Sequence, residues 1–215
     1  ELVPQLHRYE ADVILLCFGM NEAFAGETGL LRFARNLSGL ATKLQEQHFN
    51  GRAPPQLVLI SPLAPEGAAS NLPTSGEQKR VLRKYCDVMA EVARQHDAAY
   101  VDLYAATEHR ARNAASRKLT FNGIHLTEYG DWVVSRQLAE RLGWIDQSAS
   151  SEASASAVAA AEKLRRLIYE KNYHFFQWWH PPNASYIHGR RNDTEGAKHL
   201  AEERRELELL VEAYN

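Results

Sequence analysis

The sequence predicts an α/β protein in which helices cover both faces of a parallel sheet. Three short runs, Asp12–Phe18, Leu57–Ile60 and Ala99–Leu103, have the composition of strands. The first run is apolar without alternation, which is typical of a strand that is covered on both faces. Longer segments with apolar residues at helical spacing separate and follow the runs. This order predicts right-handed crossovers and a three-layer α/β/α sandwich.

The predicted helices have local start and stop signals. The first extends from about Thr28 to His48, and Gly39 weakens it locally. The second extends from about Glu77 to His96, after a polar loop. The third, Glu128 to Leu142, comes directly after Thr127, a residue type that is preferred at a helix N-cap.

The composition is that of an ordinary globular protein. The chain has 215 residues, of which 45% are hydrophobic and 24% are charged, and this suffices for one main domain with an appendage. Lys and Arg number 25 against 27 Asp and Glu, so the formal net charge of -2 gives no electrostatic reason to expect a nucleic-acid partner. No apolar run approaches the ~20 residues that a membrane-spanning helix needs, so no membrane insertion is predicted. The sequence starts at Glu1 without a signal-peptide pattern, and we expect it to be part of a longer polypeptide.

The two cysteines give little functional information. Cys17 lies in the first predicted strand and Cys86 in the second predicted helix. We expect both thiols to be buried and unreactive. Sequence alone cannot supply the Cα separation that a disulfide between them would need.

The composition changes after Trp144. We predict an α/β domain over residues 1–144, a Ser/Ala-rich linker over residues 145–155 and a C-terminal helical extension over residues 156–215. The extension is expected to pack on the main domain.

The extension contains a segment that is rich in aromatic residues. Residues 172–183 hold five aromatic, two His and two Pro residues, between a predicted helix from about Ser156 to Lys171 and a charged closing helix from Glu195 to Tyr214. The His and Pro residues argue against a plain core helix. We expect the segment to bury its rings over the main domain, and a separate interaction surface is the alternative.

Two short motifs carry the candidate chemistry. Gly19-Met20-Asn21-Glu22 directly follows the first strand, and the loop Thr120–Thr127 delivers His125 just before the third helix. Because ligands bind beyond the carboxyl ends of parallel strands, we expect Asn21 and His125 to share one pocket. Histidine suits the role of general base, and an asparagine amide just past a strand can donate to an oxyanion. Two plainer interpretations stay open: His125 packs under the helix, and Asn21 is an ordinary turn residue.

These motifs resemble those of the SGNH (GDSL-type) hydrolases. Gly19–Glu22 is similar to the Gly-x-Asn-Asp block of that family, and Asn122–His125 looks like its late Asp-x-x-His block. The similarity covers roughly residues 10–143. It implies a flavodoxin-like α/β sandwich and an ester hydrolase with His125 as general base and Asn21 as oxyanion donor. It also implies that Gly19 and Glu22 line the substrate site and that neither a metal nor an organic cofactor is required.

The sequence departs from the family pattern at the nucleophile. The Gly-Asp-Ser block with its serine and a second block with a glycine donor should precede Gly19, but none of the eighteen residues there matches. Ser61, Ser70 and Ser75 are poor substitutes, because they are in the wrong place relative to the sheet order. We therefore expect that the nucleophile stands in a preceding segment or has been lost in this branch.

A second departure is Asn122, which stands where the family has aspartate. A neutral amide can orient the imidazole through its carbonyl oxygen but supplies no charge. Weak activity, a Ser-His dyad, or another acid such as Glu22 all stay open.

Two longer strings, Asn21–Gly26 and His180–Arg190, look like a bacterial SGNH branch found in large multidomain proteins that are often exported. By this resemblance the substrate is an acyl ester of a small molecule or glycan, with O-acetylated carbohydrate favoured, and Asn183 and Arg190 are expected to bind it. The alternative is a non-catalytic carbohydrate-binding module on a decayed esterase scaffold. A nucleotide-binding domain is disfavoured, because no Gly-x-Gly-x-x-Gly or Walker-type loop follows any strand.

Overall fold

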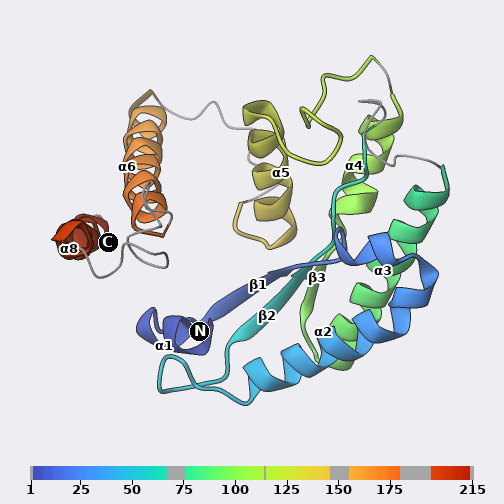
Figure 1. Cartoon of the computed structure of the whole chain (residues 1–215). Helices are drawn as coiled ribbons and strands as arrows, with labels where there is room; N and C mark the ends of the chain where they lie inside the picture. Colours follow the sequence, from blue (N-terminus) through green and yellow to red (C-terminus); the bar gives the residue numbers. More distant parts are fainter. Residues whose placement is uncertain (1, 67–75, 114, 146–154, 180–194, 214–215) are drawn as a thin grey trace. The chain divides into compact units, whose positions relative to one another are not determined.

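The computed structural model describes residues 2–66, 76–113, 115–145, 155–179 and 195–213 (Figure 1). The chain divides into two compact units, Glu1–Ala149 and Ser150–Asn215. None of the described helices is both long and apolar enough to cross a membrane. The two units are described separately below.

The first unit is built around a parallel sheet of three strands in the order β1-β2-β3. Val13 pairs with Gln56 in β1 and β2, and Val58 pairs with Ala99 in β2 and β3. Its elements in chain order are α1 (Leu2–Arg8), β1 (Val13–Cys17), η1 (Glu22–Ala25), η2 (Glu27–Gly29), α2 (Leu30–Gln45), β2 (Gln56–Ile60), α3 (Gly76–Gln95), β3 (Ala99–Val101), α4 (Leu103–Arg112) and α5 (Glu128–Arg141).

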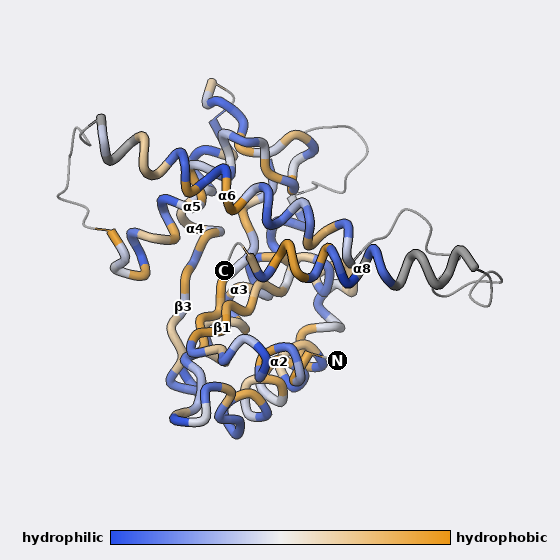
Figure 2. Tube along the Cα trace, turned by 90° about the vertical axis from the view of Figure 1, so that its left-hand side faces the viewer, coloured by the Kyte–Doolittle hydropathy of each residue, from blue (hydrophilic) through white to orange (hydrophobic). Residues whose placement is uncertain are grey.

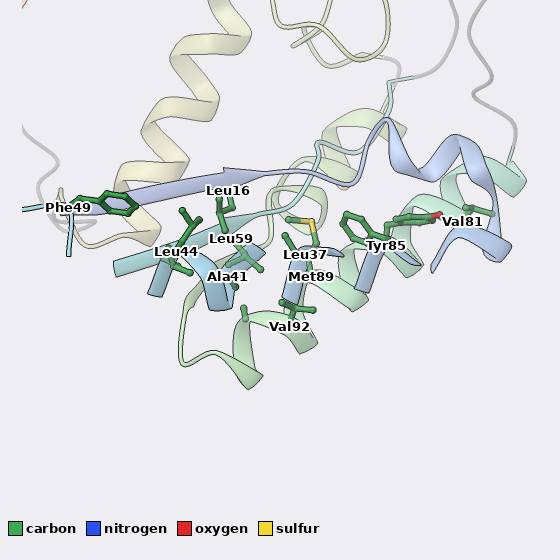
Figure 3. Packing of buried hydrophobic residues seen from close by; sticks show 13 residues of the cluster. Leu16, Leu37, Ala41, Leu44, Phe49, Leu59, Val81, Tyr85, Met89 and Val92 are labelled. Atoms are coloured by element: carbon green, nitrogen blue, oxygen red, sulfur yellow. The ribbon is translucent and has the colours of Figure 1, made fainter. Parts of the chain in front are cut away.

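Helices pack on both faces of the central strand β2. Leu57 and Leu59 belong to a buried cluster with apolar residues of α2 and α3 (Figure 3). Val58 and Ile60 point to the other face, where they form a cluster with Val134 of α5. Figure 1 shows α2 and α3 on one side of the sheet and α5 on the other. The predicted three-layer α/β/α sandwich is confirmed.

The prediction that the first strand is covered on both faces is wrong. Leu16 is buried against α2 and α3, but Val13 and Leu15 are 44% and 42% exposed and Cys17 is also exposed. Figure 2 shows that β1 is nonetheless largely hydrophobic. Among the strands that the structure describes, β1 pairs with β2 alone, so it is an edge strand with one open face. The expected burial of Cys17 is therefore also wrong, whereas Cys86 is buried as predicted.

Helix α4 was not predicted from the sequence. The third strand ends at Val101, earlier than the expected Leu103, because Asp102 caps the helix that follows. The carboxylate of Asp102 accepts a hydrogen bond from the backbone N–H of Ala105 at 2.8 Å. An Asp followed by good helix formers is an N-cap signal, and it was available in the sequence.

The second unit contains α6 (Ala155–Trp179) and α8 (Glu195–Ala213), which pack against each other. The closing helix predicted from Glu195 is confirmed by α8. The expectation that helical structure stops near Lys171 is wrong, because α6 continues through the aromatic residues. Neither Gly nor Pro occurs before Pro181 to stop it, and Phe175 and Trp178 stack along the helix with centroids 5.8 Å apart.

Part of the aromatic segment lies outside the described residues. His180, Asn183 and Arg190 belong to this part. Tyr173 and Phe176 in α6 are exposed. The expectation that the segment lies over the main domain and binds substrate stays a prediction.

Candidate active site

The loop that carries His125 folds back on itself. Thr120 and Leu126 form an isolated antiparallel bridge, and the backbone N–H of Phe121 donates to the carbonyl oxygen of His125 at 3.0 Å. Gly123 at the tip has φ 95°, a left-handed conformation that a glycine adopts without steric cost. The turn leaves the imidazole of His125 exposed, with the ring of Phe121 stacked on it at a centroid distance of 5.8 Å.

Asn122 holds both the turn and the imidazole. Its Oδ1 accepts hydrogen bonds from the backbone N–H groups of Ile124 (3.3 Å) and His125 (2.9 Å). The same amide lies against Nδ1 of the ring, with Nδ2 at 2.8 Å and Oδ1 at 3.1 Å. Asn122 is therefore in hydrogen-bond contact with the ring, and its role in orienting the imidazole stays a prediction.

The amide of Asn122 leaves two tautomers of His125 in competition. If Nδ1 accepts from the Nδ2–H of Asn122, the ring proton is on Nε2, and Nε2 cannot act as a base. If Nδ1–H donates to Oδ1, then Nε2 carries a lone pair and can take a proton. An aspartate would permit only the second arrangement, because an ionised carboxylate has no N–H or O–H to donate.

Helix α5 anchors the end of the loop. Thr127 is its N-cap, as predicted, and its Oγ1 accepts from the backbone N–H of Gly130 at 3.1 Å. The N–H and hydroxyl of Thr127 both donate to the carbonyl oxygen of Leu119, at 2.8 and 3.1 Å. Gly130 permits this close approach, because a Cβ there would overlap the same carbonyl oxygen. Leu126 packs against the buried cluster between the sheet and α5.

The loop after β1 forms the second part of the candidate site. Gly19 has φ 103°, and its N–H donates to Oε2 of Glu22 at 2.8 Å. Asn21 is exposed and precedes η1, but its side chain makes no capping hydrogen bond to that helix. Glu22 thus stabilises the turn that presents Asn21, and its observed partner is Gly19 rather than the histidine.

A cavity of about 250 Å³ lies beside this turn, between η1 and α2. Among the described residues that line it are Phe18, Asn21, Glu22, Arg32 and Asn36, and His125 is not one of them. The sharing of one pocket by Asn21 and His125 stays a prediction.

The loop after β2 contacts both of the other loops. A Cβ on Gly19 would lie 3.3 Å from Cγ of Pro62, so the first and second loops are in close contact. The backbone N–H of Glu66 donates to the carbonyl oxygen of Gly123 at 3.1 Å, which joins the second loop to the histidine loop. The segments that follow the parallel strands are thus connected at the carboxyl end of the sheet.

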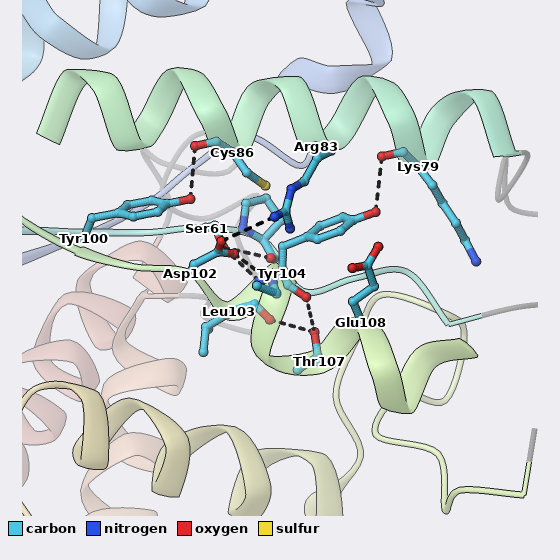
Figure 4. A network of polar contacts seen from close by, with 12 residues as sticks. Ser61, Lys79, Arg83, Cys86, Tyr100, Asp102, Leu103, Tyr104, Thr107 and Glu108 are labelled. Atoms are coloured by element: carbon cyan, nitrogen blue, oxygen red, sulfur yellow. Dashed lines mark hydrogen bonds and ion pairs between the residues drawn. The ribbon is translucent and has the colours of Figure 1, made fainter. Parts of the chain in front are cut away.

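Ser61 belongs to a polar cluster that joins α3 to the strand ends (Figure 4). Its hydroxyl accepts from the N–H of Tyr104 at 3.0 Å and lies 3.4 Å from Oδ1 of Asp102. Arg83 completes the cluster, 3.9 Å from Asp102 and over the ring of Tyr104. Because Ser61 is buried with its hydroxyl engaged, it has a structural role, as its place in the sequence suggested.

One serine–histidine pair was missed from the sequence. Oγ of Ser38 lies 2.8 Å from Nε2 of His96, and Nδ1 of His96 lies 3.0 Å from Oε1 of Gln45. These distances are those of a nucleophile, a base and an orienting group. However, Ser38 is inside α2, where the backbone N–H groups are used in the helix and cannot form an oxyanion hole. The trio therefore ties α2 to the end of α3.

No metal site is found in the part of the chain that the structure describes. There, no group of three or more His, Cys, Asp or Glu side chains is placed to hold an ion.

Comparison with known proteins decides the family. Residues 1–133 match the model of the GDSL-like lipase/acylhydrolase family. The chain belongs to this family. The GDSL-like assignment agrees with the resemblance of the Gly19–Glu22 and Asn122–His125 motifs, and it makes an ester hydrolase or acylhydrolase scaffold the coarse functional class. None of the curated proteins that were compared matches the chain.

Solved structures share the fold of this GDSL-like chain. A protein from Parabacteroides merdae that is named as a GDSL-like lipase is 18% identical, with a TM-score of 0.52 over 66% of this chain and 69% of that chain. LAE5, an α/β hydrolase from the metagenome of Lake Arreo, Spain, is 15% identical, with a TM-score of 0.50 over 67% and 69%. A variant of Axe2, an acetyl xylan esterase from Geobacillus stearothermophilus, is 16% identical, with a TM-score of 0.50 over 66% and 64%.

Proposed function

We propose that the chain carries the base and the oxyanion donor of an SGNH-type ester hydrolase. His125 is the general base, Asn21 donates to the developing oxyanion, and Asn122 orients the imidazole. The observation that supports this best is the contact between the Asn122 amide and Nδ1 of His125, in a loop that is hydrogen-bonded to Glu66 in the segment after β2. It leaves Nε2, on the opposite side of the ring, to accept a proton in one of the two tautomers.

In this mechanism a serine hydroxyl attacks the ester carbonyl carbon while Nε2 of His125 removes the hydroxyl proton. Negative charge develops on the carbonyl oxygen, where the Asn21 amide N–H stabilises it. Collapse of the tetrahedral intermediate expels the alcohol, which takes the proton back from His125. Water then hydrolyses the acyl-enzyme by the same steps. The serine is expected from outside these 215 residues, because no Gly-Asp-Ser block precedes Gly19 and the contacts of Ser61 and Ser38 are structural.

The proposed substrate is an acyl ester of a small molecule or glycan, with O-acetylated carbohydrate favoured. An acetyl xylan esterase is among the proteins of similar fold, which makes acetylated xylo-oligosaccharides a reasonable first test substrate. Gly19 and Glu22 build the turn at this site, and Asn183 and Arg190 remain proposed substrate contacts. The mechanism requires neither a metal nor an organic cofactor.

The test compares the 215-residue chain with the full-length protein on an activated acetyl ester. We expect no turnover by the chain alone. In the full-length protein, His125→Ala should lower kcat/KM by roughly 10²- to 10⁴-fold and Asn21→Ala by roughly 10²- to 10³-fold. Ser38→Ala removes the hydroxyl that lies against Nε2 of His96 and should leave the rate unchanged. Turnover by the chain alone that depends on Ser38 would mean that the nucleophile has been misassigned.

A substitution at Asn122 tests its orienting role. Asn122→Asp removes the amide N–H that competes for Nδ1, so the tautomer with a lone pair on Nε2 should dominate. In the full-length enzyme we expect kcat/KM to rise at least about tenfold. The ¹⁵N shifts of the His125 ring should report the same change in the 215-residue chain. Asn113→Asp introduces the same charge at an exposed residue outside the site and should change neither quantity.

The alternative proposal is a carbohydrate-binding module on an esterase scaffold that no longer hydrolyses. Asn122 in place of aspartate is the observation that favours it, because the imidazole lacks a charged partner. In that case the full-length protein would bind acetylated oligosaccharides without turnover, and His125→Ala would weaken binding only slightly.

A further inference from the structure

Glu66 is a buried carboxylate directly under the histidine loop. The residue is 3% exposed and follows β2 by six positions. Its carboxylate accepts hydrogen bonds from the backbone N–H groups of Leu119 (3.0 Å) and Thr120 (2.8 Å). It also accepts from the hydroxyl of Thr120 at 2.6 Å. With its own N–H bonded to the carbonyl oxygen of Gly123, Glu66 contacts the loop both before and within the turn.

The charge of Glu66 depends on these contacts. Burial is the largest single effect and would raise the pKa of the Glu66 carboxyl. The hydrogen bonds from Leu119 and Thr120 and the nearby charge of Lys118 together outweigh burial, so the pKa lies below its usual value. A buried carboxylate is unfavourable unless it is hydrogen-bonded. Here the donors are groups of the loop, so the ionised carboxylate favours the loop conformation that supplies them.

The residues that Glu66 holds are hydrogen-bonded in turn to the segment that follows His125. Thr120 bridges to Leu126, the residue after the histidine. The carbonyl oxygen of Leu119 accepts from Thr127, two residues after the histidine. Displacement of Leu119 and Thr120 would therefore move His125 relative to the end of the sheet.

We propose that Glu66 is a positioning residue for His125: its carboxylate holds residues 119–123 in the conformation that presents the imidazole. The catalytic consequence rests on the proposed function of His125, whereas the conformation of the loop does not. Glu66→Gln is the sharpest variant, since it keeps the size of the side chain. The NH₂ group of the glutamine would face at least one of the three donors, which are the N–H of Leu119 and the N–H and hydroxyl of Thr120. An NH₂ group cannot accept a hydrogen bond from a donor.

The first experiment needs no activity. Amide hydrogen exchange and the ring signals of His125 are measured by NMR in the 215-residue chain. In Glu66→Gln we expect exchange at Leu119 and Thr120 to accelerate at least tenfold relative to the amides of β2, with a shift of the His125 ring signals. The matched control is Glu108→Gln, which removes a carboxylate that is paired with Arg112 at 2.6 Å in α4 and should leave the loop unchanged.

The second experiment uses the full-length esterase. Glu66→Gln should lower kcat at least tenfold with KM within twofold, and Glu66→Asp, which keeps the charge, should recover part of kcat. Thr120→Val, which removes only the hydroxyl donor, covers the case in which Glu66→Gln does not fold, and it should accelerate exchange at Leu119. Unchanged loop exchange and His125 signals in the folded variants would overturn the proposal. A wild-type protein without turnover would instead refute the proposed function, and the NMR result would still decide the role of Glu66.

Discussion

At Gly130 the first turn of α5 makes a close backbone contact with the candidate catalytic loop. A Cβ there would overlap the carbonyl oxygen of Leu119 and would lie 2.8 Å from its carbonyl carbon. It would also lie 2.9 Å from Cδ2 of Leu126. The neighbours that would have to move are mainly backbone atoms, and Thr127 is bonded to the same carbonyl oxygen. Gly130→Ala should therefore separate the loop from the helix that anchors it.

The size of the effect follows from opposing contributions. In a helix, alanine is favoured over glycine by about 1 kcal/mol. Overpacking a tight contact typically costs about 1–3 kcal/mol, and a lost hydrogen bond from Thr127 would add about 1 kcal/mol. We expect Gly130→Ala to lower the free energy of unfolding by about 1–3 kcal/mol net. Gly39→Ala is the control, because Gly39 is exposed in α2 and a Cβ added there would have no neighbouring atom within 4 Å. This substitution should raise the free energy of unfolding by about 0.5–1 kcal/mol.

Urea unfolding followed by far-UV circular dichroism measures both changes. The two midpoints should shift in opposite directions from the wild type, with the slope of the free energy against urea unchanged. NMR signals of Leu119 and His125 should move in Gly130→Ala only. A Gly130→Ala chain that is as stable as the wild type, with an unmoved loop, would refute the close approach.

Two further predictions concern ionisable groups. The pKa of Glu66 is lowered in the folded chain, so its stabilising contribution is complete above its usual pKa of 4.5 and is lost as pH falls through the lower folded value. Glu66→Gln should remove this acid-dependent part of the unfolding free energy. If the unfolding free energy of the variant depends on pH as steeply as that of the wild type, the prediction is wrong. Burial raises the pKa of both thiols, that of Cys86 to about 12, and only Cys17 is exposed. Cys17 alone should therefore react with a thiol reagent at about pH 8 before unfolding. The rapid reaction should be lost in Cys17→Ser. Rapid modification of Cys86 in the folded chain would contradict the prediction that Cys17 is the reactive thiol.

The elements that were predicted correctly have local causes. The apolar run of β2 and the Thr127 cap of α5 depend on residues close in sequence, so their patterns could be recognised directly. The open face of β1 could not be predicted, because an apolar run reports composition and not which neighbours cover it. Helix α4 was missed although Asp102 marks its start, because the strand pattern was extended through the cap.

The candidate site was only partly predictable for a similar reason. Asn122 and His125 are three residues apart, and the resemblance of this segment to the Asp-x-x-His block suggested their contact. Glu66 lies 53 residues before Leu119 in the sequence, and nothing in either segment indicates the other. The pairing of Ser38 with His96 spans 58 residues and was equally invisible. Contacts of this kind depend on how the strands order themselves in the sheet.

The dipeptide at the tip of the histidine loop has a chemical consequence of its own. Asn122 is followed by Gly123, and a glycine nitrogen is unhindered in attacking the side-chain amide carbon to release ammonia. Hydrolysis of the resulting succinimide through one of its carbonyl groups converts Asn122 to aspartate, and through the other to isoaspartate. The aspartate product would place a negative charge against Nδ1 of His125, so ageing of the protein would give the Asp-x-x-His pattern that this segment resembles. Isoelectric focusing and peptide mapping of stored protein would detect the change, and the fraction that contains aspartate at position 122 should favour the Nδ1-protonated ring.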